Sequence, residues 1–368
     1  MNSFKIGDLT IPIPIIQGGM GIGISLSGLA SAVANMGGIG VISSVGIGLI
    51  NSSAERNPRK RNIEAIRQEI RKARQATKGI LGVNIMSVIT DFSDMVKTSI
   101  EEGIDIIFSG AGMPLDLPRY LSKDSKTRLA PIVSSARAAT ILCRKWKQNF
   151  DYLPDALVVE GPKAGGHLGF KNSQLEDKNH SLEQLVSDVT EVSRQMKDEY
   201  NKDIPVIAAG GIYTGSDMYE IMKKGASGVQ LGTRFVATEE CDASKAFKDT
   251  FVQARSQDVR IIKSPVGMPG RTITNTFLDE AEAGQRRPTA CKYNCIKSCN
   301  PKTTSYCIAN ALIAAYKGNL SDGFAFSGSN VDQVKGITTV PEVFREIKNE
   351  YQTASQQFTI KTKTYAYG

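Results

Sequence analysis

The chain has 368 residues, of which 41% are hydrophobic and 22% charged, and its formal net charge is +8. This composition excludes a disordered chain and a small disulfide-stapled scaffold, and the length suffices for one large barrel with an added unit. Much of the positive charge lies in residues 56–78, where acidic and basic residues recur at helical spacing. That pattern favours a solvated helix face over a nucleic-acid site.

The apolar stretches of the chain are short. Even Ile204–Ile212 cannot span a bilayer, and the first residues lack the apolar core of a signal peptide. We therefore expect a cytoplasmic protein that binds neither membranes nor nucleic acids. The six cysteines then predict thiols or metal ligands rather than disulfides.

Eight short, almost continuously apolar runs predict parallel strands that are covered on both faces. They are Ile13–Gln17, Ile39–Ser43, Leu81–Ile85, Ile106–Ser109, Ala130–Ser134, Leu157–Glu160, Val206–Ala209 and Val229–Gly232. Helical patterns separate several of them, namely Leu26–Met36, Asn62–Thr77, Leu182–Tyr200 and Asp217–Lys224. This alternation predicts an α/β fold, a (β/α)8 TIM barrel. A doubly wound open sheet is the alternative, because periodicity alone does not show closure.

Glycines and polar residues follow the ends of these runs, and in a barrel those ends meet at one face. The sixth run continues into Gly165-Gly166-His167, while Gly210-Gly211 and Gly232-Thr233 follow the seventh and eighth. Barrels usually bind phosphate at these late loops, since backbone N–H groups without a neighbouring Cβ can approach it closely. We therefore expect a phosphate-bearing ligand there; ordinary glycine turns are the alternative.

His167 is the predicted catalytic residue. An ordinary histidine pKa of about 6.5 allows either protonation state near neutrality. As a neutral imidazole it could take a proton or donate a hydrogen bond to a ligand, and as an imidazolium it could polarise a carbonyl. The alternative is a structural histidine beside the ligand. His180, in a polar loop, receives no role.

Six segments together resemble the nitronate monooxygenase family, formerly the 2-nitropropane dioxygenases, which includes flavin-dependent enoyl-acyl-carrier-protein reductases. They are Pro14–Met20, Ala32–Gly40, Gly82–Met86, Glu160–Gly169, Pro205–Gly211 and Gln230–Phe235. The resemblance implies a TIM barrel that holds FMN non-covalently. The residues it implies at the cofactor are Gly18, Gly19, Met20, Asn84, Glu160, Ala164, Gly165, Gly166, Gly210, Gly211, Gln230, Gly232 and Thr233.

The resemblance leaves the reaction open. We predict an FMN-dependent oxidoreductase that oxidises alkyl nitronates with O2, with His167 as base or polariser. One alternative is an NAD(P)H-dependent enoyl thioester reductase, for which an acyl carrier protein is a candidate partner; the other is a flavin-binding redox sensor without efficient turnover. A homodimer is also among the candidate assemblies.

The region after the barrel departs from a simple barrel pattern. We divide the chain into an FMN-binding barrel at 1–237, a lid region at 238–339 and a docking helix and tail at 340–368. Residues 264–271 predict a Pro/Gly-rich turn that caps the site, and residues 323–328 a loop packed over the flavin pocket. Helices are predicted over Ile308–Lys317 and Val340–Tyr351.

Four of the six cysteines lie within seventeen residues of the lid region. Four thiolates in one loop can complete a zinc site or a [4Fe–4S] site. Cysteines four residues apart on a helix could instead be buried thiols facing the core. The candidate ligands are Cys291, Cys295, Cys299 and Cys307.

Overall fold

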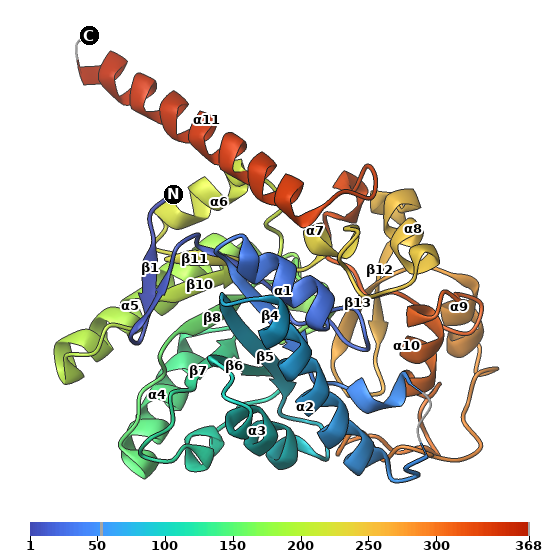
Figure 1. The fold of residues 1–368 in the computed structure, drawn as a ribbon. Coiled ribbons are helices and arrows are strands. Elements are labelled where there is room, and N and C mark those ends of the chain that lie inside the picture. The colour runs from blue at the N-terminus through green and yellow to red at the C-terminus, as the bar shows by residue number, and fades with distance from the viewer. Residues whose placement is uncertain (52–53, 367–368) are drawn as a thin grey trace.

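The computed structural model describes residues 1–51 and 54–366, and its centre is a closed barrel of eight parallel strands (Figure 1). Neighbouring strands pair in the order β10-β11-β3-β4-β5-β6-β7-β8. Each strand falls on one of the predicted apolar runs, so the TIM-barrel prediction is confirmed and the open sheet is excluded. The barrel strands are β3 (Ile15–Gln17), β4 (Ile39–Ser43), β5 (Ile80–Met86), β6 (Ile106–Gly110), β7 (Arg128–Val133), β8 (Leu157–Glu160), β10 (Val206–Ala209) and β11 (Gly228–Leu231).

Apolar side chains fill the barrel interior. Ile16, Val41, Phe108 and Val158 belong to one buried cluster contributed by different strands. A small antiparallel hairpin joins this cluster with Ile6 and Ile11; its strands are β1 (Phe4–Ile6) and β2 (Leu9–Ile11). The barrel is therefore a packed core, and a ligand can enter only at the ends of its strands.

Helices surround the strands and bury the outer apolar layer. Between β6 and β7 the connection holds only the 3-10 turn η2 (Leu117–Tyr120), which contains a proline. The helices that accompany the barrel are α1 (Ser27–Asn35), α2 (Pro58–Ala76), α3 (Phe92–Glu101), α4 (Ala136–Phe150), α5 (Leu182–Tyr200), α6 (Gly215–Lys223) and α7 (Thr233–Val236).

Local sequence signals explain where several helices begin. Asn57 caps α2 with its side chain and a proline follows it, so both signals of a helix start coincide. The Ser181 hydroxyl caps α5. Thr214 and Asp217 form a reciprocal capping box at the start of α6.

The chain after the barrel forms a small sheet and further helices on the barrel mouth. Strand β13 (Pro269–Ile273) pairs with β12 (Val259–Lys263) and also with β9 (Gly166–His167), in the order β12-β13-β9. The remaining helices are α8 (Lys245–Gln253), α9 (Thr276–Glu282), α10 (Ile308–Tyr316) and α11 (Val340–Ala366). Short 3-10 turns are η1 (Ile47–Leu49), η3 (Asn172–Gln174), η4 (Lys178–His180), η5 (Ser256–Asp258) and η6 (Val331–Gln333).

Helix α11 packs its first turns against the barrel and then extends away from it (Figure 1). Its Glu350 carboxylate accepts a hydrogen bond of 2.6 Å from the Gly215 backbone N–H at the start of α6, and Glu346 pairs with Arg234. The helix runs to Ala366, beyond the predicted end at Tyr351. Within residues 1–51 and 54–366, no helix is both long and apolar enough to cross a membrane.

Candidate active site

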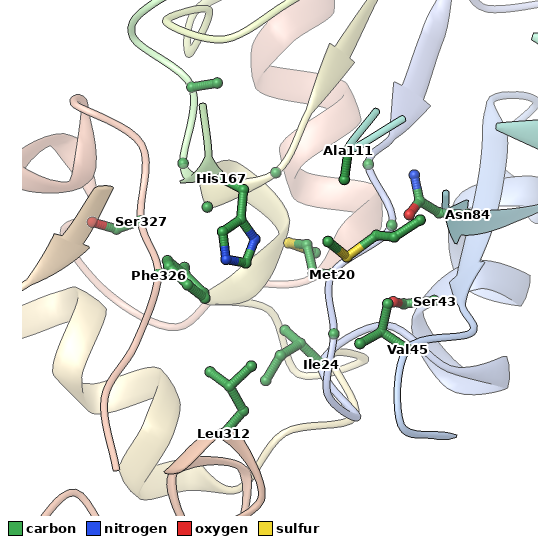
Figure 2. A pocket seen from close by; sticks show the side chains of 18 of the residues that line it. Met20, Ile24, Ser43, Val45, Asn84, Ala111, His167, Leu312, Phe326 and Ser327 are labelled. Atoms are coloured by element: carbon green, nitrogen blue, oxygen red, sulfur yellow. The ribbon is translucent and has the colours of Figure 1, made fainter. Parts of the chain in front are cut away.

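A cavity of about 280 Å³ opens at the carboxyl ends of the barrel strands (Figure 2). The barrel contributes Met20 from a loop and Asn84 from β5, and the segments after the barrel contribute Leu312 and Phe326. Apolar surface predominates, with a few polar groups among it. A deep, mostly apolar cavity with a small number of convergent polar groups is typical of a cofactor site.

Two amide side chains at the ends of β5 and β11 face this cavity without protein partners. Asn84 and Gln230 both line it, and neither side chain has a hydrogen-bond partner among the described residues. Gln17 behaves differently: it is fully buried, and its amide oxygen accepts a hydrogen bond of 2.9 Å from the Val41 N–H. Asn84 and Gln230 are therefore free to bind a ligand, whereas Gln17 holds the barrel together.

The late glycine loops lie at one end of the cavity, where the backbone itself forms the wall. Gly211 has φ of +90°, and a Cβ on it would lie 2.9 Å from the Cβ of Lys163. A Cβ on Gly165 would lie 2.5 Å from the backbone of Ser327. A larger residue at either position would strain or displace the loop, so the close approach of these segments depends on glycine.

Residues 327–330 fasten the late loops together. The Gly328 N–H donates to the Thr233 hydroxyl at 2.9 Å, and the Asn330 side chain donates to the carbonyl of Gly211 at 2.9 Å. The Ser329 N–H donates to the carbonyl of Lys163 at 3.1 Å. A segment far from the barrel in sequence therefore fixes three of its loops.

His167 projects into the middle of the cavity from β9 (Figure 2). Its Nε2 shares a hydrogen bond of 2.7 Å with the hydroxyl of Ser264, and its ring lies 4.9 Å from the ring of Phe326, centroid to centroid. Nδ1 has no hydrogen-bond partner among the described residues. Burial lowers the pKa of His167 to about 4, so the imidazole is neutral at pH 7.

Glu160 ends β8 and also faces the cavity. Its carboxyl group has no hydrogen-bond or ionic partner in the described part of the chain. Burial therefore raises its pKa to about 7. The Glu160 side chain, like that of His167, is partly exposed to the cavity. Both groups therefore lose solvent because the cavity walls surround them, and neither lies in the hydrophobic core. The cavity thus holds a neutral base and a carboxyl group that is partly protonated at neutral pH.

Arg271 braces the loop that carries His167. The residue is only 8% exposed, and its Nη1 donates to the carbonyl oxygens of Pro162 at 2.6 Å and Ala164 at 2.7 Å. It has no carboxylate partner among the described residues, and burial lowers its pKa. The guanidinium of Arg271, on β13, therefore fixes the backbone of residues 162–164, which lead into β9.

The four clustered cysteines lie in the loop between α9 and α10, and all are unpaired thiols. The N–H of Thr90 donates to the carbonyl of Cys295 at 3.2 Å, and Cys295 itself lines the cavity. No group of three or more His, Cys, Asp or Glu side chains in the described ranges is arranged to hold a metal ion. The loop is irregular, so the alternative of cysteines on successive helical turns is wrong.

Every residue that the resemblance implied at the cofactor lines this single cavity, and so does His167. His180 lies apart, bonded to Asp177 and Gln174 in its own loop. Sequence reasoning missed Ser264 and Arg271 as functional residues. The only signal for either was its place in the Pro/Gly-rich segment 264–271, which gives no indication that β13 pairs with β9.

Comparisons with known proteins agree with this arrangement. A family model described as nitronate monooxygenase matches residues 2–350. A Mycobacterium tuberculosis relative, (3aS,4S,5R,7aS)-5-hydroxy-7a-methyl-1-oxo-octahydro-1H-indene-4-carboxyl-CoA dehydrogenase, is 28% identical over 273 residues; the match covers 74% of this chain and only 66% of the relative. A probable nitronate monooxygenase from Staphylococcus saprophyticus is 27% identical over 307 residues, covering 74% of this chain and 78% of the relative.

Solved structures show the same fold along almost the whole chain. FabK from Thermotoga maritima superposes with a TM-score of 0.73 and 28% identity, covering 95% of this chain and 96% of that one. A nitroalkane oxidase from Streptomyces ansochromogenes superposes with a TM-score of 0.71, covering 95% and 98%. At 20% identity, the second match shows the fold alone.

Proposed function

The chain belongs to the nitronate monooxygenase family, and from that premise we propose that this oxidoreductase binds FMN in the barrel cavity and oxidises alkyl nitronates with O2. The single observation that carries the proposal is His167, a neutral imidazole held in the middle of the cavity with Nδ1 free. FMN would supply the electron transfer. The residues of the chain would supply binding, orientation and proton handling.

Several features of the cavity support the binding of FMN. Glycine backbone at Gly210, Gly211 and Gly232 offers close approach for a phosphate, and Thr233 adds a hydroxyl. Lys163 packs its stem against Gly211 and has no ionic partner among the described residues, so its ammonium group can neutralise that phosphate. The side-chain amides of Asn84 and Gln230, which have no protein partner among the described residues, can bind the polar edge of the flavin ring and the ribityl chain.

The protonation state of His167 favours one of its two candidate roles. With a pKa near 4 it does not carry the charge needed to polarise a carbonyl as an imidazolium at neutral pH. It can instead hold an oxygen of the nitronate through an N–H. As a base it would act where the substrate arrives as the neutral nitroalkane, whose carbon beside the nitro group still carries the proton that a nitronate has lost. Ser264 fixes the ring orientation from Nε2, which makes it a positioning residue.

The alternative reaction is the NAD(P)H-dependent reduction of an enoyl thioester. The Mycobacterium tuberculosis relative is named for a carboxyl-CoA substrate, which is a thioester, and this observation keeps the alternative open. An acyl carrier protein would then be a partner, and the positive net charge would favour an acidic one.

Anaerobic stopped-flow spectroscopy of the FMN-loaded protein separates the reactions. The protein is mixed in turn with an alkyl nitronate, NADH and NADPH. Flavin bleaching by the nitronate at a saturable rate supports the proposal. Bleaching by NAD(P)H alone, followed by reoxidation with an enoyl thioester, replaces it with the reductase. If the flavin is bleached but no organic substrate is turned over, the protein would be a redox sensor.

A further inference from the structure

Glu160 lies on the floor of the cavity, at the top of the barrel interior. Side chains alternate along a strand, and Val158, two residues earlier on β8, belongs to the cluster that fills the barrel. Glu160 therefore points inward as well, and it lines the cavity. Asn84 and Gln230 stand near the carboxyl ends of β5 and β11 and also line it. A carboxyl group and two amides thus face the cavity from the barrel, whereas His167 reaches it from β9, outside the barrel sheet.

The protein supplies no partner for this carboxyl group. Its register partner on β10 is Ala209, which has no polar side chain, and the Gly161 N–H donates to the carbonyl of Ala209 at 2.9 Å. No hydrogen bond or ion pair reaches the Glu160 side chain from any described residue. A structural polar group behaves differently here, since Gln17 accepts a hydrogen bond from the Val41 N–H. The Glu160 side chain therefore fastens nothing within the barrel.

The other titratable groups of the cavity leave Glu160 uncompensated. Those that line it are Asp91, Lys163, His167, Tyr213 and Cys295. None of them is bonded to Glu160, whose pKa is raised to about 7 by burial alone. Arg271, a buried cation nearby in the fold, donates to backbone carbonyls instead. An isolated carboxyl group in such surroundings is most stable in its protonated form, because an unpaired buried charge is costly.

A protonated carboxyl group can donate a hydrogen bond, which a carboxylate cannot do. The ring system of a flavin carries carbonyl oxygens and ring nitrogens that accept hydrogen bonds. The side-chain N–H groups of Asn84 and Gln230 can donate to atoms of the same kind. An ionised Glu160 would repel these acceptors, so the floor of the cavity suits such a ring only while Glu160 keeps its proton.

We propose that Glu160 stays a neutral carboxylic acid when FMN is bound and donates a hydrogen bond to an acceptor atom of the flavin ring. The inference rests on the proposed binding of FMN and is independent of the reaction with nitronates. It links FMN binding to one proton. As pH rises through about 7, the carboxyl group of the FMN-free protein ionises, and binding must then take up a proton. The dissociation constant should therefore rise by up to about tenfold per pH unit above that value.

The test is fluorescence titration of the full-length apoprotein with FMN at several pH values on both sides of 7. Glu160→Gln keeps a side-chain N–H donor and cannot ionise, so its affinity should be close to that of the wild type in acid and should lack this fall in alkali. The FMN phosphate and Lys163 are present in both proteins, and their effects cancel in the ratio of the two dissociation constants. Glu176→Gln is the matched control, because Glu176 is exposed and does not line the cavity. It should follow the wild type.

Infrared difference spectroscopy of the wild type adds a measurement that needs no variant. Above pH 7, the FMN-bound protein minus the FMN-free protein should show a gain of a protonated carboxyl group. A ratio of dissociation constants that does not change with pH would overturn the proposal, as would the absence of that gain, even in a protein that oxidises nitronates. A pH-dependent ratio in a protein that does not oxidise them would uphold the role of Glu160 and refute the reaction alone. Failure to bind FMN at any pH would overturn both.

Discussion

Replacing Ser264 with alanine removes the hydroxyl that positions the proposed catalytic imidazole. That hydroxyl lies 2.7 Å from Nε2 of His167 and also accepts a weaker hydrogen bond, 3.3 Å long, from the Val266 N–H. Leaving a buried polar group unpaired costs about 1 to 3 kcal/mol. If that cost falls on the transition state, kcat/KM falls by roughly 5- to 150-fold, because about 1.4 kcal/mol corresponds to a factor of ten.

The assay is the anaerobic rate of flavin bleaching at increasing concentrations of nitronate, with bound FMN measured by absorbance. We expect Ser264→Ala to retain FMN, since Ser264 is not among the residues that line the cavity. The loss should appear mainly in kcat, because the hydroxyl orients a reacting group and does not bind substrate. Ser264→Thr keeps the hydroxyl and should recover most of the rate. An unchanged kcat/KM in fully flavinated Ser264→Ala would refute the positioning role.

Three further predictions concern the cavity. His167→Ala should keep its flavin and lose about 100-fold or more in turnover of organic substrate, the usual contribution of a general base; an unchanged kcat/KM would remove it from the mechanism. Gly211→Val should lower the FMN-to-protein ratio after gel filtration, whereas Gly336→Ala, with open space around its Cα, should not. Because its pKa is lowered to about 4, His167 stays neutral as pH falls through 6.5, so the acid limb of kcat/KM should lie near pH 4. A transition near pH 7 that disappears in Glu160→Gln would belong to Glu160, whose carboxyl ionises as pH rises through that value.

The barrel was predictable from sequence because each strand is buried on both faces. Val158 and Ile207 lie within continuous apolar runs, and both are fully buried in the barrel interior. Such runs need no information about distant residues to be recognised. Once the strands are placed, barrel geometry alone brings their carboxyl ends together. The prediction that Asn84, Gly211 and Gln230 would share a cavity follows from that rule.

The structure of residues 238–339 was less predictable because it depends on strand pairing between segments that are distant in the sequence. Gly270 pairs with His167, about 100 residues earlier, and neither segment alone has the length or alternation of a strand. Proline and glycine in residues 264–271 predicted a turn, and the turn is present, but a strand begins at Pro269. The end of α11 was also missed, since the residues after Tyr351 are mostly polar and carry no apolar stripe to mark a helix, although Phe358 still contacts Tyr219 of α6.

Residues from two parts of the chain line the cavity. This arrangement suggests how members of one family can carry out different reactions. The glycine loops and the unpaired amides come from the barrel, whereas Ser264 and Phe326, which contact His167, come from beyond residue 237. A cofactor held by barrel backbone constrains the barrel sequence little except at glycine positions. The shape around the reacting side of the flavin would instead be set by the lid, where loops can change without disturbing the barrel. Exchanging residues 264–271 between family members should therefore alter substrate preference before it alters flavin binding.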